Sequence, residues 1–214
     1  MDFSGKNILV VGASGVLGAN FIEALSEAGA NLYGTATSAE SAQRIPASAN
    51  LKLLLDLTSD ESITTLANYL NAEVPLDGVI LSAGVVGFGP ATEASHDQVE
   101  RMNRINYLGQ VRLLNLLKDN LAGREQAFVL SVTGIVAQTP LPNMSHYSSS
   151  KAALHGFLTA VTREWRRDGV QVVSSVLGHT ETGLASRPLF GTAPAFPAGL
   201  DPKAAAAELL ATIN

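Results

Sequence analysis

Short apolar runs alternate with amphipathic segments along the whole chain. The first run, at residues 7–11, is Ile, Leu and Val after a single Asn, which predicts a strand buried on both faces of a parallel sheet. Five further apolar runs, bounded by Gly, Asp or other polar residues, predict five more strands. The predicted strands cover residues 7–11, 31–35, 51–55, 78–81, 126–132 and 170–176.

Between these runs, apolar residues recur at spacings of three and four, the period of an amphipathic helix. The two longest predicted helices cover residues 96–119 and 146–167. Side chains able to cap a helix N-terminus stand at Ser59 or Asp60, at Ser95 and at Asp201. The first long helix is expected to run through the apolar residues Val99, Met102, Ile105, Leu108, Val111, Leu114 and Leu117.

Strand and helix alternate from one end of the chain to the other, with no internal repeat and no linker between domains. This order predicts the α/β class, because a helix that follows each strand can cross back over the sheet and cover it. The prediction is a single Rossmann-type, doubly wound parallel sheet of six strands. It forms a single domain over residues 1–214.

Composition narrows the classes of function. The 214 residues are 46% hydrophobic and 15% charged, which is enough apolar material for a large core, and the net charge is −5. No basic block is present, so neither nucleic acid nor an anionic membrane is expected as the main partner. No cysteine is present, which excludes thiol catalysis and disulfides, and no signal peptide is recognisable. We therefore expect a cytoplasmic protein.

The turn after the first predicted strand is the first candidate for chemistry. Residues 12–18 read G-A-S-G-V-L-G and lead directly into a helical pattern. Backbone N–H groups at the start of such a helix can bind a pyrophosphate, and glycines let the phosphate approach the backbone. The alternative is a tight turn that only connects two elements. Strand, glycine turn and helix together favour a dinucleotide site.

The end of the second predicted strand bears on which dinucleotide is bound. Folds that prefer NAD usually place a carboxylate there to bind the ribose hydroxyls. Here the chain has Thr35 and Thr37, and no acid occurs before Glu40. A 2′-phosphate would meet hydroxyls and no negative charge, so NADP(H) is favoured over NAD(H). No Arg or Lys stands in this stretch either; Arg44 is the nearest.

Tyr147 and Lys151 are four residues apart at the start of a predicted helix, so they share one face. An ammonium beside a phenol favours the phenolate, lowers the tyrosine pKa and makes it useful in proton transfer. The same spacing is also common for ordinary surface pairs. His146, His155 and His179 do not have the spacing of a zinc motif, so no metal site is expected.

Taken in order, these signals make the chain resemble the short-chain dehydrogenase/reductase family. The resemblance extends from residue 3 to about residue 210. Within it, the segment 29–38 is similar to bacterial 3-oxoacyl-[acyl-carrier-protein] reductases, which use NADPH. The matching motifs are the glycine turn, Asp56-Leu57-Thr58, Ser82-Ala83-Gly84, Asn106, Tyr147-x-x-x-Lys151 and the segment Gly178 to Thr182.

The resemblance implies an enzyme that transfers a hydride between a nicotinamide cofactor and a carbonyl/alcohol pair. It also implies that residues 1–214 form one NAD(P)-binding Rossmann domain with the substrate site built in. Tyr147 would give or take the proton, and Lys151 would hold the nicotinamide ribose and lower the pKa of Tyr147. Asn106 would maintain a water relay to Lys151. The implied cofactor-binding residues are Gly12, Ser14, Gly15, Val16, Leu17, Gly18, Thr35, Thr37, Asp56, Leu57, Ser82, Ala83, Gly84, Tyr147, Lys151, Gly178 and Thr182.

The chain departs from the family pattern at several positions. Val16 stands where the family's glycine turn usually has a glycine, and Gly15 replaces the basic residue that many NADP-dependent members carry there. Leu177-Gly178 replaces the family's Pro-Gly. The family's last strand is missing, which is why six strands are predicted, and with it the usual C-terminal contact between subunits. A homodimer or homotetramer through the two long helices is still expected by resemblance.

The largest departure concerns the catalytic serine. The family's serine is expected thirteen residues before the tyrosine, and Gly134 occupies that position. Thr133 is then a candidate replacement. Alternatively, Ser131 is the equivalent residue and three residues are inserted after it. A hydroxyl that donates to a developing oxyanion accelerates catalysis by about 10²–10³-fold. The alternative function is therefore a cofactor-binding, regulatory protein with little or no catalysis.

The substrate is expected to be a small or acyl-linked carbonyl compound. The Pro-, Gly- and Ala-rich segment 183–199 is predicted to cover the pocket. Its Leu189, Phe190 and Phe196 favour an apolar portion in the ligand, although the same side chains could simply close the core.

Overall fold

The protein, described here from a computed structural model for residues 1–213, is built on one six-stranded parallel sheet. The strand order is β3-β2-β1-β4-β5-β6, so the order reverses between β1 and β4, as in a doubly wound fold. The six predicted strands are confirmed, with bounds that differ by a residue or less. They are β1 (Asn7–Val11), β2 (Asn31–Ala36), β3 (Leu51–Leu54), β4 (Gly78–Leu81), β5 (Ala127–Val132) and β6 (Val170–Ser175).

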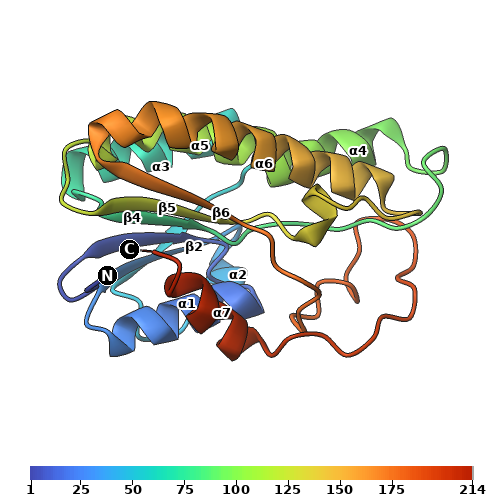
Figure 1. Cartoon of the computed structure of the whole chain (residues 1–214), viewed down its shortest axis with the longest axis horizontal. Coiled ribbons are helices and arrows are strands. Elements are labelled where there is room, and N and C mark those ends of the chain that lie inside the picture. Colours follow the sequence, from blue (N-terminus) through green and yellow to red (C-terminus); the bar gives the residue numbers. More distant parts are fainter. Residues whose placement is uncertain (214) are drawn as a thin grey trace.

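Helices cover both faces of the sheet (Figure 1). On one face lie α3 (Asp60–Glu73), α5 (Gly109–Leu121) and α6 (Ser145–Trp165); on the other lie α1 (Val16–Glu27) and α7 (Pro202–Leu210). The short α2 (Ala39–Ala42) follows β2, and α4 (His96–Asn103) precedes α5. Short 3₁₀ turns cover Ile135–Ala137 and Arg166–Asp168.

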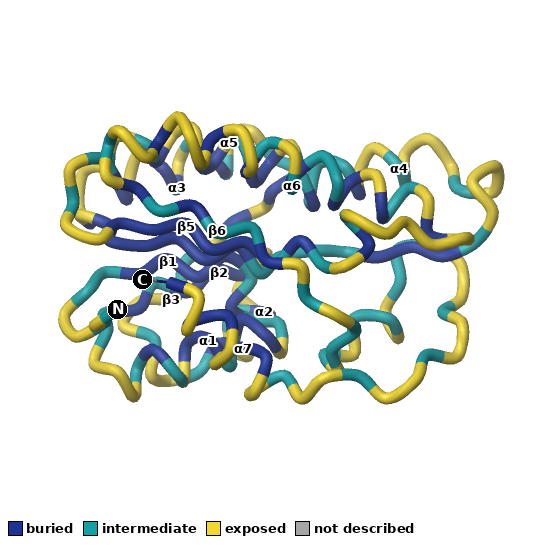
Figure 2. Tube along the Cα trace, viewed as in Figure 1, coloured by how far each residue is buried: buried dark blue, intermediate teal, exposed yellow. Residues whose placement is uncertain are grey.

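The sheet separates two apolar cores. One contains the inward faces of α3, α5 and α6, and the other contains those of α1 and α7. Figure 2 shows the central strands buried, whereas most of the segment after β6 is exposed or partly exposed. Leu51 and Leu54 are exposed because β3 is an edge strand. The core therefore fixes the sheet and leaves the loops at its carboxyl edge free to form a site.

The long helix predicted over residues 96–119 is interrupted. A π-helical turn, Arg104–Leu108, separates α4 from α5. A π turn adds one residue to the local period, so the buried face shifts by about one position. Met102 before the turn and Leu113 after it are fully buried, but Leu108 is 44% exposed. The prediction of one uninterrupted helix over residues 96–119 was therefore wrong at this turn.

No helix among residues 1–213 is both long and apolar enough to cross a membrane.

Candidate active site

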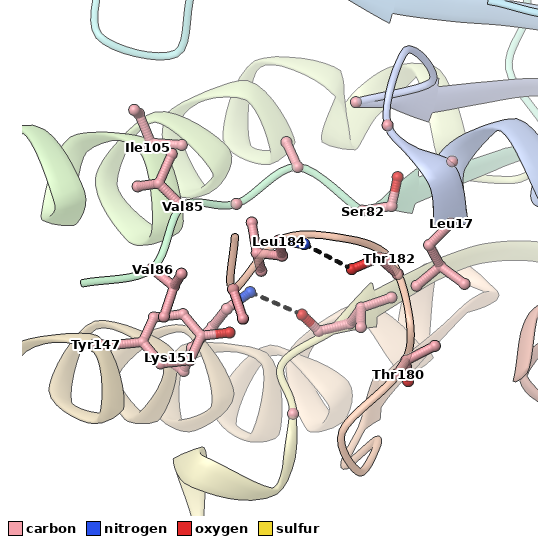
Figure 3. A pocket seen from close by; sticks show the side chains of 18 of the residues that line it. Leu17, Ser82, Val85, Val86, Ile105, Tyr147, Lys151, Thr180, Thr182 and Leu184 are labelled. Carbon is pink, nitrogen blue, oxygen red and sulfur yellow. Dashed lines mark hydrogen bonds between the residues drawn. The ribbon is translucent and has the colours of Figure 1, made fainter. Parts of the chain in front are cut away.

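A cavity of about 760 Å³ opens at the carboxyl ends of the strands. This is the place where doubly wound sheets hold their ligands, next to the reversal in strand order. Figure 3 shows part of the wall, with Tyr147 and Lys151 on α6 and Thr180 and Thr182 on the segment after β6. Each of the residues predicted to bind the cofactor lines this cavity. In residues 1–213, no three His, Asp or Glu side chains are grouped so that they could hold a metal ion.

The glycine turn is packed so closely that two of its glycines have no room for a side chain. Gly12 has φ +85°, and a Cβ there would lie 2.8 Å from the backbone N of Ala83. A Cβ at Gly18 would overlap the carbonyl O of Gly12. At Gly15 the nearest atom would be 3.4 Å away. Gly12 and Gly18 are thus required by the close approach of β1, α1 and β4.

The start of α1 leaves backbone donors for an anion. Gly15 is the N-cap and makes no side-chain capping bond, and no acidic residue occurs in the first turn. The N–H groups of this first turn therefore have no carboxylate competing for them, and the helix dipole favours a negative group beside them. Val16, where the family usually has glycine, is 42% exposed at the cavity wall. This geometry fits a pyrophosphate.

At the end of β2, the two predicted threonines differ in availability. The Thr35 side chain is buried, and its Oγ1 accepts a hydrogen bond from the N–H of Gly12 (3.1 Å). Thr35 therefore holds the glycine turn in place, whereas Thr37 is exposed at the cavity wall. Asp56, across from them in the wall, has its carboxylate bound to the N–H and hydroxyl of Thr58.

Asn106 lies behind the cavity and is not part of its wall. It is fully buried in the π turn, and its amide pairs with both the N–H and the C=O of Val85 (2.8 Å each). It also donates to Ser150 Oγ on α6 (3.0 Å). A Cβ at Gly84 would lie 3.3 Å from Asn106 Oδ1 and 3.4 Å from Lys151 Nζ. Asn106 thus joins the loop after β4 to the helix that carries Tyr147 and Lys151.

Tyr147 and Lys151 reach the cavity from the first two turns of α6. Lys151 Nζ donates to the carbonyl O of Val132 at the end of β5 (2.9 Å). Burial lowers the pKa of Lys151 to about 8 and raises the pKa of Tyr147 to about 12. The expected lowering of the Tyr147 pKa by Lys151 is absent: burial of the phenol alone sets the direction of its shift, and the Lys151 ammonium is hydrogen-bonded to Val132 O. Tyr147 is consequently a neutral phenol, the form that can donate a proton.

The candidates for the missing serine hydroxyl differ in position. Ser131 is fully buried inside β5 and does not line the cavity, whereas Thr133 does line it. The Thr133 hydroxyl, however, donates to the carbonyl O of Ser175 (2.6 Å) and lies 3.4 Å from Ser174 Oγ. His155 Nδ1 in turn lies 2.8 Å from Ser174 Oγ. The hydroxyl proton of Thr133 is therefore used in a hydrogen bond to the backbone of β6.

Gly134 has φ +81° and ψ 156°. Residues with a side chain rarely adopt this conformation. A Cβ at Gly134 would nevertheless have space, with the nearest atom, the carbonyl O of Leu177, 3.7 Å away. The backbone conformation at position 134 therefore favours glycine, and this glycine leaves the position without a hydroxyl.

The segment after β6 closes over one end of the cavity. The N–H of Leu189 donates to Val86 O (2.7 Å), and the N–H of Phe88 donates to Phe190 O (3.0 Å), so the segment is joined to the loop after β4. Phe196 lines the cavity and stacks on His179, with ring centroids 4.9 Å apart. Of the predicted apolar side chains, Phe196 alone lines the cavity; Leu189 and Phe190 do not.

Comparison with known proteins agrees with this geometry. The family model described as short chain dehydrogenase matches residues 6–188. The chain belongs to the short-chain dehydrogenase/reductase family. The relatives reported below are named as dehydrogenases or reductases.

Two family members illustrate how distant the relatives are. The NADPH-dependent 1-acyldihydroxyacetone phosphate reductase of Saccharomyces cerevisiae is 29% identical in an alignment 194 residues long, which covers 86% of this chain and 64% of that protein. The 3-oxoacyl-[acyl-carrier-protein] reductase of Escherichia coli is 28% identical in an alignment 188 residues long, which covers 86% of this chain and 77% of that protein. The chain therefore spans less than two thirds of the yeast relative.

Solved structures of short-chain dehydrogenases share the fold. One from Streptomyces avermitilis superposes with a TM-score of 0.87 at 24% identity and covers 99% of this chain and 85% of that one. One from Burkholderia cenocepacia, in complex with NADP, has a TM-score of 0.83 at 25% identity, with the same coverage.

Sequence reasoning missed part of the wall. Arg101 on α4 and Arg187 after β6 line the cavity, as do Met144 and Phe88. Arg101 stands one turn before Ile105, which also lines it, so a shared helix face was the available signal. Nothing in the local sequence indicates that Arg187 turns toward the site, because its segment is irregular.

Proposed function

We propose that this chain is an NADP(H)-preferring oxidoreductase that interconverts a carbonyl compound and its alcohol, with Tyr147 as the acid and base. The observation that carries the proposal is one continuous cavity that contains both the glycine turn and the neutral phenol of Tyr147. Doubly wound folds bind a dinucleotide at such a turn. The absence of a carboxylate at Thr35 and Thr37 supports NADP(H) over NAD(H), as do the NADPH-dependent yeast relative and the NADP complex of the Burkholderia protein.

The cofactor would supply the hydride, and the chain's own residues would bind, orient and transfer a proton. Gly12, Gly18 and the first turn of α1 would hold the pyrophosphate, and Asp56 would lie at the adenine end. Ala83, Gly84 and Lys151 would border the nicotinamide ribose. Thr182, which lines the cavity on the segment after β6, would contact the carboxamide.

In the reduction direction, Tyr147 would donate its phenolic proton to the substrate oxygen. A phenol with a pKa of about 12 holds its proton throughout the neutral range, so the acid form is always ready. In alcohol oxidation the same group must first lose the proton, which a cationic Lys151 turned toward the ribose would favour. Asn106 acts as a positioning residue, because it fixes the Val85 loop against α6.

The test is NADPH consumption with a panel of carbonyl compounds, using the wild type and Tyr147→Phe. The substitution removes the proton donor and keeps the ring, so kcat/KM is expected to fall by at least about 10²-fold, in the range of general-acid effects. NADPH binding, measured by fluorescence titration, should stay within about twofold. Full activity in Tyr147→Phe would show that the assigned mechanism is wrong.

A second candidate function is a cofactor-binding protein with little catalysis. The conformation of Gly134 and the commitment of the Thr133 hydroxyl to Ser175 favour it, because neither position offers a free hydroxyl to a substrate oxygen. It predicts tight NADPH binding with no turnover of any carbonyl compound. The same panel separates the two, since only the enzyme consumes NADPH.

A further inference from the structure

The cavity carries an excess of positive charge. Its wall contains three cationic side chains, Arg101, Lys151 and Arg187, and one carboxylate, Asp56. The chain as a whole has a net charge of −5, so this excess is local. Lys151 belongs to the reaction centre beside Tyr147, and Asp56 lies at the end assigned to the adenine. The two arginines are left without a role in the proposed chemistry.

Arg101 has a free guanidinium at the cavity wall. It is an exposed residue near the end of α4, one turn before Ile105, and Figure 3 shows Ile105 beside Val85. No hydrogen bond or ion pair joins its side chain to another of the described residues. The neighbouring Arg104, by contrast, forms an ion pair with Asp60 (3.5 Å). An unpaired cation in the wall of a ligand cavity attracts an anionic ligand group.

Arg187 is held in place by neutral acceptors. Its Nε donates to Gly183 O (3.1 Å) and its Nη2 lies 3.4 Å from Thr182 O. Two carbonyl oxygens fix the guanidinium next to Leu184 but do not neutralise it. Arg187 therefore adds a second positive charge, on the segment that closes the cavity.

The remaining wall at this end is apolar. Val86, Phe88, Val136 and Met144 form a small buried cluster. The ring of Tyr147 packs against this cluster. Leu184, Ala185 and Phe196 pack there as well. A substrate that presents its carbonyl to Tyr147 must lie along this apolar surface, which favours a ligand with a hydrocarbon portion.

We propose that the substrate is an amphipathic carbonyl compound. Its hydrocarbon portion lies on the apolar cluster that contains Val86 and Met144, and its carboxylate or phosphate binds Arg101, with Arg187 as the second cation. A carboxylate and a phosphate each present two oxygens that can accept the paired N–H donors of one guanidinium. The proposal rests on the oxidoreductase function above and names its substrate class.

The experiment compares charged substrates with neutral isosteres. The probes are 2-, 3- and 4-oxooctanoate, their methyl esters, and an eight-carbon keto alcohol with and without a phosphate. Each is measured as kcat/KM with NADPH. The wild type is expected to prefer the anion over its neutral partner at least tenfold, and the better of carboxylate and phosphate identifies the anionic group.

Variants then assign the preference to residues. Arg101→Ala should lower kcat/KM for the anion by about tenfold to a hundredfold, the range for a lost hydrogen bond to a charged group, and change the ester by less than about twofold. Arg101→Lys should restore part of the loss. The control is Arg163→Ala, an exposed arginine on α6 outside the cavity, which should change neither value. Arg187→Ala should weaken the anion preference by a smaller factor.

Two kinetic outcomes would overturn the proposal. One is an equal loss of kcat/KM on the anion and on the ester in Arg101→Ala. The other is a loss of kcat/KM that is explained by weaker NADPH binding in this variant, which would place the arginine on a cofactor phosphate.

Calorimetric titration of the NADP⁺ complex with octanoate, octyl phosphate and octanol needs no turnover. If no carbonyl compound is reduced, the proposed function fails, yet anion binding that depends on Arg101 would still be measured. Equal binding of octanol and both anions would overturn the proposal itself.

Discussion

Gly134 permits a sharp test of whether this chain has simply lost a serine. Its φ of +81° and ψ of 156° lie in a region that costs a residue with a side chain about 1–3 kcal/mol. The backbone cannot relax freely, because the N–H of Gly134 donates to Ser175 O (3.2 Å) and the N–H of Ile135 donates to Leu177 O (2.8 Å). Gly134→Ser and Gly134→Ala should therefore both lower the free energy of unfolding by that amount. For a chain of this size the loss corresponds to roughly 2–12 °C in Tm.

The hydroxyl itself is separated from the strain by comparing the two variants. A well-placed donor is worth about 10²–10³ in kcat. A Cβ at position 134 would lie 3.7 Å from Leu177 O, so the introduced hydroxyl has a carbonyl acceptor close by and is expected to bond to it. We therefore expect the kcat of Gly134→Ser to stay within about threefold of that of Gly134→Ala.

Two measurements check this expectation: urea unfolding followed by circular dichroism, and NADPH oxidation with the best carbonyl substrate. The Ala variant is the matched control, since it carries the backbone strain without the oxygen. If Gly134→Ser were at least tenfold faster than Gly134→Ala and as stable as the wild type, the position would be an intact serine slot. The argument from backbone conformation would then be refuted.

Two further predictions concern pH and the glycine turn. Burial lowers the pKa of Lys151 from 10.5 to about 8, so the folded chain binds fewer protons than the unfolded chain between these pH values. The free energy of unfolding should therefore rise between pH 8 and 10. Urea unfolding should show this rise in the wild type and a weaker one in Lys151→Met. Above pH 10 the raised pKa of Tyr147 acts in the opposite direction, and the rise should stop. Gly18→Ala should abolish NADPH binding or unfold the chain, because its Cβ would overlap Gly12 O. Gly15→Ala should remain folded and lose less than about tenfold in NADPH affinity, because its Cβ has more space. If the two variants bound NADPH equally in fluorescence titration, the packing argument would be contradicted.

The sequence alone determined the order of the elements and much of the cofactor site. Strand runs, helix period and the glycine turn are local signals, so they can be recognised without knowing what packs against them. Tyr147 and Lys151 share a face because the α-helix has a fixed period. The parallel, doubly wound order then brings the carboxyl ends of distant strands to one edge, which is why the predicted cofactor residues line one cavity.

Properties that depend on contacts between distant segments became evident only in the folded chain. The hydroxyl of Thr133 faces the backbone of β6, and the pKa of Tyr147 rises because the phenol is buried. Arg101 and Arg187 are far apart in sequence, and only the closure of the segment after β6 places them in one wall. The direction of a side chain, its desolvation and the charge of a cavity all depend on neighbours in space, and the local sequence does not specify those neighbours.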